Sequence, residues 1–304
     1  MPDHPREVDL ADSRALDGVL RRHGVRAARS LGQRFLVDRG VLEAIVDAAE
    51  LGDGDDRGNL TTRGSQDVLE VGPGPGVLTA ALADRARSVT AVEVDERMVA
   101  VLRDTLHGRD NVRIVRADAL EVDLYALGER PPTRIVANLP YQITTPLLER
   151  FLADPRRPPL VVVLVQEEVA RRMAASESNE RAPRERGFLS VFVQSFAEAR
   201  VVRRVPPRAF RPEPRVSSAV VALRTRATPA FAPLEQRAFL KFVSDVFRHR
   251  RKQLRSALGH EAAVEKERAN SALAAANIEP RRRPEELSIA EWVALATELG
   301  VPRG

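Results

Sequence analysis

Four consecutive residues, Asn138, Leu139, Pro140 and Tyr141, combine the atoms needed to hold a planar amine in place. The Asn138 side-chain oxygen and the Leu139 carbonyl can accept hydrogen bonds from the two N–H groups of an exocyclic amine such as that of adenine. These two hydrogen bonds would orient the lone pair of the amine nitrogen. Pro140 stiffens the turn and donates no hydrogen bond, and Tyr141 can stack on the base for roughly 1–3 kcal/mol. The tetrapeptide predicts group transfer to an adenine nitrogen, with orientation supplying most of the rate. The alternative is an ordinary Asn-Pro turn with a packed tyrosine.

A glycine-rich turn, Glu70–Gly76, lies earlier in the chain. Gly72, Gly74 and Gly76 allow a sharp turn and let main-chain N–H groups approach a ligand at the positive end of the following helix. Rossmann nucleotide sites use similar turns. The turn therefore indicates a nucleotide-like cofactor without identifying it.

Three acids stand beside this turn or at the ends of expected strands. Glu70 precedes the turn, Glu93 ends the second strand and Asp118 follows the third. Glu93 can accept both hydroxyls of a ribose, and Asp118 can accept a hydrogen bond from an adenine amino group. NAD would also use Glu93, and solvated strand ends are the alternative for both Glu93 and Asp118. Together with the acceptor tetrapeptide, the acids favour S-adenosylmethionine as a methyl-donating cofactor.

A second aromatic residue, Phe210, lies in the proline-stiffened basic loop 206–214. A rigid loop with one phenylalanine among arginines suits a flipped nucleotide, so Phe210 is expected to cover the other face of the base. The alternative is a core phenylalanine under the loop. Gln166, after the fifth strand, is a further candidate for the border of the pocket.

Composition restricts the possible chemistry. The 304 residues include no cysteine, which excludes disulfides, thiolate metal sites and cysteine nucleophiles, and we expect no metal. There is no apolar run long enough to span a membrane, and the N-terminus is polar and contains acids, unlike a signal peptide. We expect a cytoplasmic protein with no membrane partner.

Basic residues gather in two places, although the formal net charge is only +5. Residues 200–215 contain six arginines and one acid, and residues 248–255 contain five lysines or arginines and no acid. Clustered arginine suggests a polyanionic partner. The alternative is a solvated helix face together with the arginine bias of a GC-rich genome. The candidate RNA-binding residues are Arg208, Arg211, Arg215, Arg248, Arg250, Arg251 and Lys252.

Strand and helix patterns alternate through the middle of the chain. Strands are predicted over 67–71, 88–93, 112–115, 133–137 and 160–165, and helices over 76–87, 96–106 and 145–152. This alternation predicts an α/β fold with a parallel, doubly wound, Rossmann-like sheet that binds ligands at the carboxyl ends of its strands.

The flanking segments complete the expected organisation. A polar tail with a helix over 13–23 occupies residues 1–30, a methyltransferase domain spans 31–228, and a small all-helical RNA-binding domain spans 229–304. Asp38 is expected to cap a helix that buries Val41, Ile45 and Val46. We further predict a flexible connection over 52–66, a helix over 188–196, and strands over 200–205 and 217–223.

With these residues assembled, the chain resembles the bacterial 16S rRNA adenine dimethyltransferases. The resemblance covers nearly the whole chain and depends on several separated blocks in order, which together are far more specific than any one of them. The blocks are Leu31–Leu36, Glu70–Gly76, Asn138–Tyr141, Val165–Ala170, Phe210–Val221, Phe247–Leu258 and Arg283–Ser288.

The resemblance implies that S-adenosylmethionine is used to dimethylate two adjacent adenosines in the 3′-terminal hairpin of small-subunit rRNA, late in ribosome assembly. It places cofactor contacts on Leu36, Gly72, Glu93, Asp118, Asn138 and position 34. The family usually has Asn at that position, and this chain has Arg34. A bulky cation at this position puts the side-chain contact with the cofactor in doubt. The main chain at position 34 could still contact the cofactor, or the Arg34 side chain could point outward toward an RNA phosphate.

Two other functions are compatible with these residues. A 23S rRNA adenine methyltransferase of the macrolide-resistance type would share the fold and the chemistry, although the full helical tail and the Asn-Leu-Pro-Tyr form favour the 16S type. A non-catalytic rRNA-binding assembly factor is kept open by Arg34. No separate DNA-target domain is apparent, so DNA is not an expected partner. We expect a monomer that acts on 16S rRNA in immature 30S subunits.

Overall fold

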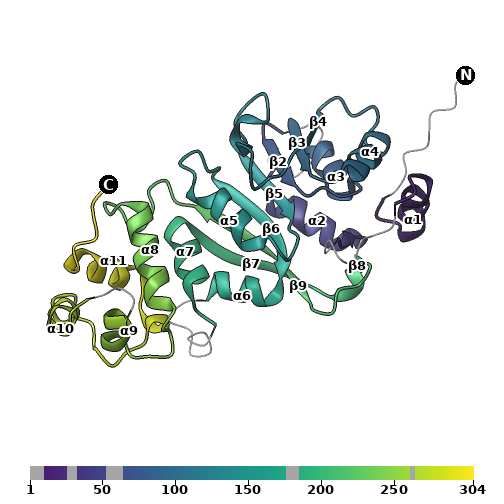
Figure 1. Ribbon diagram of the computed structural model, residues 1–304. Coiled ribbons are helices and arrows are strands. Elements are labelled where there is room, and N and C mark those ends of the chain that lie inside the picture. Colours follow the sequence, from purple (N-terminus) through teal and green to yellow (C-terminus); the bar gives the residue numbers. More distant parts are fainter. Residues whose placement is uncertain (1–9, 26–32, 53–63, 176–184, 261–263) are drawn as a thin grey trace, which may run out of the picture. The chain divides into compact units, whose positions relative to one another are not determined.

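The computed structural model describes residues 10–25, 33–52, 64–175, 185–260 and 264–304. Seven strands form one sheet in the order β4-β3-β2-β5-β6-β9-β7 (Figure 1). Their bounds are Asp67–Val71 (β2), Ser88–Glu93 (β3), Val112–Arg116 (β4), Arg134–Asn138 (β5), Leu160–Gln166 (β6), Ala197–Val205 (β7) and Ser218–Thr225 (β9).

The sheet reverses its winding direction at its centre. From β2 the chain proceeds through β3 to β4 on one side, and then returns to β5 and β6 on the other. The pairs β2–β3, β3–β4, β2–β5 and β5–β6 are all parallel. Neighbouring strands that lead away in opposite directions leave a crevice at their carboxyl ends, which is where open α/β sheets bind ligands.

The predicted strands agree closely with those observed. β2 and β3 have the expected bounds, and β4, β5 and β6 each end one residue later than expected. Consequently Asn138 is the last residue of β5 rather than the first residue after it. The late strands β7 and β9 are also found, with β7 beginning three residues before the predicted start at 200.

Helices fill the expected connections between strands. They are α1 (Ser13–Arg22), α2 (Arg39–Ala48), α3 (Val77–Arg85), α4 (Glu96–Thr105), α5 (Thr144–Ala153), α6 (Glu167–Ala174) and α7 (Phe188–Phe196). Asp38 caps α2 as predicted, because its Oδ1 accepts a hydrogen bond from the Val41 N–H at 2.9 Å. The connection expected over 52–66 lies, for residues 53–63, outside the described residues.

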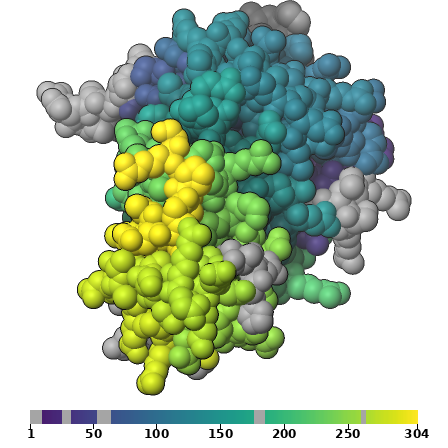
Figure 2. Space-filling view, turned by 60° about the vertical axis from the view of Figure 1, so that its left-hand side comes forward, coloured from purple at the N-terminus to yellow at the C-terminus, as the bar shows by residue number. Residues whose placement is uncertain are grey.

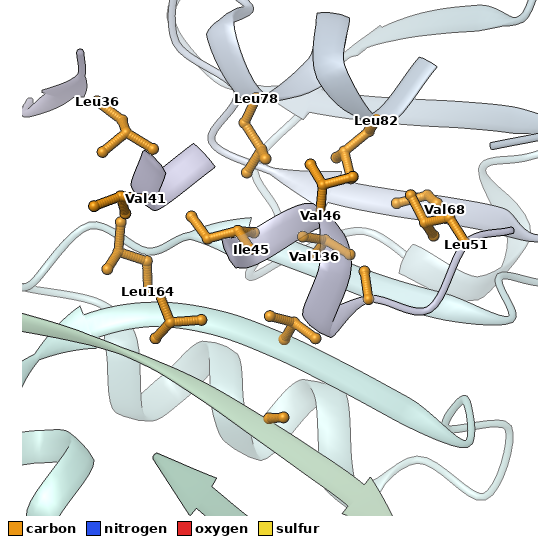
Figure 3. Packing of buried hydrophobic residues seen from close by; sticks show 14 of the residues in the cluster. Leu36, Val41, Ile45, Val46, Leu51, Val68, Leu78, Leu82, Val136 and Leu164 are labelled. Atoms are coloured by element: carbon orange, nitrogen blue, oxygen red, sulfur yellow. The ribbon is translucent and has the colours of Figure 1, made fainter. Parts of the chain in front are cut away.

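The main core lies between α2, α3 and the sheet. Val41 and Ile45 of α2 are almost fully buried, and their helical spacing places them on one face with Val46. Figure 3 shows this face packed close to Leu78 of α3 and Leu164 of β6. The apolar side chains of β2, β5 and β6 therefore lie under a continuous helical cover.

A small antiparallel pair joins two distant segments that flank the sheet. Strand β1 (Phe35–Leu36) pairs with β8 (Phe210–Arg211), with Phe35 opposite Arg211 and Leu36 opposite Phe210. The Val37 N–H also donates to the Ala209 carbonyl at 2.8 Å. The sequence predicted neither strand, because two residues show no alternation and the pairing partners are far apart in the chain.

The described residues divide into two compact units. One comprises the residues up to Ala170 together with Arg200–Leu223, and the other comprises Arg171–Ala199 and Arg224–Gly304. Residues 171–199 thus belong with the C-terminal helices and not with the strands that flank them in sequence. The expected division at 228/229 into independent domains stays a prediction.

The second unit contains α8 (Gln236–Phe247), α9 (Leu254–His260), α10 (Lys266–Ala275) and α11 (Ile289–Glu298). Figure 2 shows the atoms of this C-terminal part of the chain, in light green to yellow, gathered in one region. The fully buried Trp292 packs on Phe242 and Phe247. Arg186 is also fully buried, and its guanidinium donates to the Leu287 carbonyl at 2.9 Å. None of the helices in the described part of the chain has the length and apolar character needed to cross a membrane.

Strands β2 and β3 are tied together at their starting ends by one buried carboxylate. Asp67 accepts hydrogen bonds from the Arg87 guanidinium and, at 2.7 Å, from the Ser88 hydroxyl. These donors, Arg87 first, lower the pKa of Asp67 below its ordinary value. The group is therefore charged in the folded protein over a wider pH range than in the unfolded chain.

We predict that Asp67→Asn lowers the free energy of unfolding by about 1–3 kcal/mol at neutral pH, because Arg87 and Ser88 lose a charged acceptor. Since the folded pKa lies below the unfolded value of about 3.9, the contribution is present above that pH and is lost as pH falls through the folded pKa. Urea unfolding of both proteins between pH 7 and pH 3 measures the difference between their free energies of unfolding. This difference should become smaller as the pH falls.

Asp47→Asn is the matched control. Asp47 pairs with Arg85 at 2.6 Å but is 66% exposed, so its removal should change stability by less than about 1 kcal/mol. An Asp67→Asn gap that stays constant down to pH 3 would contradict the assigned role of the charge.

Candidate active site

A cavity of about 220 Å³ lies in the first unit, at the carboxyl ends of the central strands. Its walls come from segments far apart in the sequence: Gln33–Leu36, the glycine turn, the end of β3, the loop after β4, and Asn138–Ile143. The fold brings these segments together because β2 and β5 are neighbours at the point where the winding reverses.

The glycine turn needs its glycines for conformation and for space. Gly74 has a φ of +56°, and a Cβ at this residue would lie 3.2 Å from the Phe35 ring. Gly76 has a φ of +92° and begins α3 as its N-cap. Gly72 and Gly74 line the cavity, whereas Gly76 does not. Gly76 therefore supports the turn from outside the cavity.

Glu93 lies at the end of β3, directly against the glycine turn. Its Oε2 accepts from the Gly74 N–H at 3.3 Å and its Oε1 accepts from the Asp95 N–H at 2.9 Å. Burial raises the pKa of Glu93, and the two main-chain donors oppose that rise. Asp118 also lines the cavity, and its Oδ1 accepts from the Leu120 N–H at 2.8 Å. Both predicted acids thus reach the same cavity.

Glu70 is the most deeply buried acid of the cavity wall. It is 1% exposed, and its Oε2 has no hydrogen-bond partner in the part of the chain that the structure describes. Burial raises the pKa of Glu70 to about 8, and the nearby carboxylate of Glu93 adds to the rise. Unless a cation is bound beside it, Glu70 is therefore mostly protonated at neutral pH.

Asn138 has its amide orientation fixed by the opposite wall. Its Nδ2 donates to the Arg34 carbonyl at 3.0 Å. Among the described residues, neither Asn138 Oδ1 nor the Leu139 carbonyl accepts a hydrogen bond. The two oxygens predicted to hold an amine are therefore those that remain available, and Asn138, Leu139 and Pro140 all line the cavity.

Tyr141 is held by a residue that the sequence did not indicate. Its phenol lies 2.8 Å from the hydroxyl of Ser218, which is fully buried at the start of β9. Burial raises the pKa of Tyr141, while the Ser218 hydrogen bond and the charge of Arg34 oppose the rise. Ser218 gave no local signal because its contact to Tyr141 joins two separate blocks of the sequence.

Position 34 lies in the cavity wall, as expected for a cofactor contact. Arg34 and the buried Leu36 both line the cavity. The Arg34 side chain is half-buried, and its Nη1 donates to the Gln33 carbonyl at 2.8 Å. Leu31 and Gly32, which begin this block, lie outside the described residues. Exposed Val94 also lines the cavity, and the sequence did not point to it.

Phe210 does not reach the cavity. Its ring is 2% exposed and belongs to the core cluster that contains Leu36 and Val205. This position favours the packing alternative, because covering a base would require the ring to leave the core. Gln166 does not line the cavity either. The base-covering role of Phe210 stays an untested prediction.

The candidate RNA-binding residues are divided between the two units. Arg208, Arg211 and Arg215 are exposed on the loop of the first unit, and Arg211 pairs with Asp17 of α1 at 2.9 Å. In the second unit Arg248, Arg251 and Lys252 are exposed and Arg250 is half-buried, all just after α8.

Comparison with known proteins identifies the family. The family described as "Ribosomal RNA adenine dimethylase" matches residues 24–299. The chain belongs to this family. A ribosomal RNA small subunit methyltransferase A of Moorella thermoacetica is 40% identical over 290 residues, covering 92% of this chain and 95% of that protein. The protein of the same name from Geobacillus thermodenitrificans is 38% identical over 301 residues, covering 96% and 97%.

Solved structures agree in fold. The 23S rRNA methyltransferase ErmE is 30% identical, with a TM-score of 0.63 over 87% of this chain and 99% of that one. A dimethyladenosine transferase from Plasmodium falciparum, at 22% identity and a TM-score of 0.72, covers 87% of this chain and 97% of its own and shows the fold alone. The predicted family, fold class and S-adenosylmethionine-dependent rRNA adenine dimethyltransferase activity are confirmed.

The cavity fits the cofactor of this family. The acids at the ends of β2 and β3 are suited to an ammonium group and to ribose hydroxyls, and Glu70 keeps an oxygen without a protein partner among the described residues. The glycine turn leaves room for a ligand because side chains at Gly72 and Gly74 are excluded by conformation.

We predict that Glu70→Gln changes how stability depends on pH. The folded pKa of about 8 exceeds the unfolded value of about 4.3, so between these values the unfolded state binds fewer protons. The wild-type protein should therefore lose stability as pH rises from 5 to 8. The variant lacks this titrating group, so its free energy of unfolding should rise relative to that of the wild type over the same pH range. Urea unfolding without ligand measures both values. Exposed Glu96→Gln is the control, and parallel wild-type and Glu70→Gln profiles would refute the assignment.

We also predict that Ser218→Ala and Tyr141→Phe act through one hydrogen bond. Each should lower kcat/KM for methyl transfer to rRNA by about 3–10-fold, chiefly through KM, and the double variant should fall little further. The neighbouring Ser217→Ala should leave kcat/KM unchanged. Additive losses in the double-mutant cycle would show that Ser218 does not act through Tyr141.

Proposed function

We propose that this chain transfers methyl groups from S-adenosylmethionine to the N6 amino groups of two adjacent adenosines in the 3′-terminal hairpin of 16S rRNA. Its substrate would be the immature 30S subunit, and it would act as a cytoplasmic monomer. The relatives that match over more than 90% of this chain are named small subunit methyltransferases, which supports this target.

The fixed amide of Asn138 carries the proposal. Because Nδ2 donates to the Arg34 carbonyl, Oδ1 is the atom that faces an incoming donor. Oδ1 and the Leu139 carbonyl can then accept the two N6 protons of adenine. The lone pair of the nitrogen is aimed out of the plane defined by these bonds, and orientation of this kind can supply several kcal/mol of the barrier.

Tyr141 positions the base itself. The ring borders the cavity beside Asn138, and the Ser218 hydroxyl restrains its phenol at 2.8 Å. A stacked base would gain roughly 1–3 kcal/mol. For Phe210 to cover the other face of the base, RNA binding would have to draw its loop away from the core.

The cofactor would be held by Leu36, Gly72, Gly74, Glu93 and Asp118, with Gly76 supporting the turn. When bound, S-adenosylmethionine supplies a methyl carbon activated by its sulfonium. Glu93 would accept the ribose hydroxyls, and Asp118 would accept from the adenine amino group. The proton released from N6 after transfer is acidic and passes to water, so no strong protein base is required.

We infer that the two basic clusters contact rRNA phosphates, which supply a salt-dependent, sequence-independent part of the affinity. Arg211 would exchange its partner Asp17 for phosphate. The residues concerned are Arg208, Arg211 and Arg215 in the loop, and Arg248, Arg250, Arg251 and Lys252 after α8.

The specific rival is methylation of 23S rRNA. The likeness to ErmE, at 30% identity over 87% of this chain, favours it. The same Asn138 geometry would serve either RNA, so the active site does not discriminate between them. The choice must come from RNA contacts outside the cavity.

We predict that labelled methyl groups enter unmodified 30S particles and not 23S rRNA, and that Asn138→Ala reduces this transfer by roughly 100–1,000-fold, as loss of one hydrogen bond to a reacting group does elsewhere. Binding of the variant to 30S particles should remain close to wild type, since the target base is the one part of the RNA that Asn138 would contact. Filter binding alongside the transfer assay measures both.

Three outcomes would contradict the proposal. Incorporation into 23S rRNA alone supports the resistance-type enzyme. Incorporation into neither RNA, with tight 30S binding, supports a non-catalytic assembly factor. Equal loss of transfer and of 30S binding in Asn138→Ala would remove the assigned role of the amide.

A further inference from the structure

Acidic groups dominate the wall of the cavity. Glu70, Glu93, Asp95 and Asp118 line it, whereas Arg34 is the single basic residue among the described residues of the wall. Asp95 is paired with Arg97 at 2.8 Å, outside the lining. The remaining carboxyls favour positive groups and hydroxyls, so Arg34 is the described side chain of the wall suited to a negative group.

The guanidinium of Arg34 is only partly satisfied by the protein. Nη1 donates to the Gln33 carbonyl at 2.8 Å, but Nε is fully buried and has no hydrogen-bond partner among the residues that the structure describes. A buried donor without an acceptor is energetically unfavourable. Burial raises the pKa of Tyr141, and the positive charge of Arg34 acts against that rise.

The methionine end of S-adenosylmethionine carries an ammonium and a carboxylate. An ammonium favours the ionised form of the buried acids and is attracted to it, whereas a carboxylate placed beside an ionised Glu93 would be repelled. On the basis of the function proposed above, we propose that the Arg34 guanidinium binds the cofactor's carboxylate in a charge-assisted hydrogen bond. Arg34 is then a cofactor-binding residue through its side chain, and its charge adds an attraction that a neutral side chain at this position would lack.

This pairing resolves the conflict between Arg34 and the sulfonium. A lone guanidinium near the methyl-donating end would repel a positively charged sulfur. Paired with a carboxylate, it presents no net charge to the sulfonium. The main-chain carbonyl of Arg34 meanwhile holds Asn138 whatever side chain stands at this position. The acceptor geometry and the cofactor contact are thus made by different atoms of one residue.

An RNA phosphate is the competing partner for Arg34. A phosphate contact would require an exposed guanidinium, whereas this side chain is half-buried in the cavity wall and its Nε is fully buried. The loop arginines Arg208 and Arg215 are exposed instead. Burial therefore favours the small ligand.

The test compares two thioether ligands that differ only by the carboxylate: S-adenosylhomocysteine and its decarboxylated analogue. By calorimetry on the full chain without RNA, Arg34→Asn should weaken S-adenosylhomocysteine roughly 5–10-fold, typical of one charge-assisted hydrogen bond. Affinity for the decarboxylated analogue should stay the same or improve. Arg34→Lys should recover part of the loss. Arg103→Asn, which removes an exposed arginine of α4 outside the cavity, should match the wild type for both ligands.

An equal change for the two ligands would overturn the assignment, because the preference for the carboxylate would not depend on Arg34. Unchanged binding of both ligands with weakened 30S binding would assign Arg34 to RNA phosphate instead. Failure of the wild type to bind S-adenosylhomocysteine at all would contradict the proposed function itself, which separates that failure from an error about Arg34.

Discussion

The parallel pairing of β2 with β5 is the constraint on which the site depends. Val68 lies opposite Arg134 and Leu69 opposite Ile135, so the glycine turn after β2 and Asn138 at the end of β5 emerge at the same edge of the sheet. A Cβ on Gly72 would lie 3.7 Å from the Pro140 ring, which shows how closely the two turns approach. A shift in this register would separate the cofactor wall from the acceptor wall, although each turn would keep its own conformation.

The segment around Arg34 is the third wall, and the distant loop near Phe210 holds it in place. The β1–β8 pair joins Leu36 to Phe210, and the Val37 N–H bonds to the Ala209 carbonyl. Phe210 then packs in the same core as Leu36. In this structure Phe210 therefore helps to fix β1, which directly follows Arg34, the residue whose carbonyl accepts from Asn138. An aromatic residue within this basic loop thus supports a wall of the cavity without lining it.

Much of the fold could be predicted from the sequence because its signals are local. Strands β2 and β3 are short buried runs that end in acids or glycine, and Asp38 is a cap directly before an amphipathic helix. The failures are non-local. Two-residue strands β1 and β8 have no period, the Ser218–Tyr141 contact joins separate blocks, and residues 171–199 pack with helices far along the chain. Whether Phe210 is buried or exposed likewise depends on tertiary packing that residue types do not encode.

The charged groups of the cavity influence one another and are not independent contacts. Glu70 and Glu93 would repel each other if both were ionised, and the raised pKa of each reflects burial without a countercharge. Protonation of Glu70 relieves that repulsion while no ligand is present. A bound cation lowers the free energy of the ionised form, so binding of a positively charged ligand must be linked to proton release near neutral pH. S-adenosylhomocysteine lacks the sulfonium and gives up that part of the attraction. An acidic cavity would therefore favour the methyl donor over its product by charge, and the carboxylate that both ligands carry is the group proposed for Arg34.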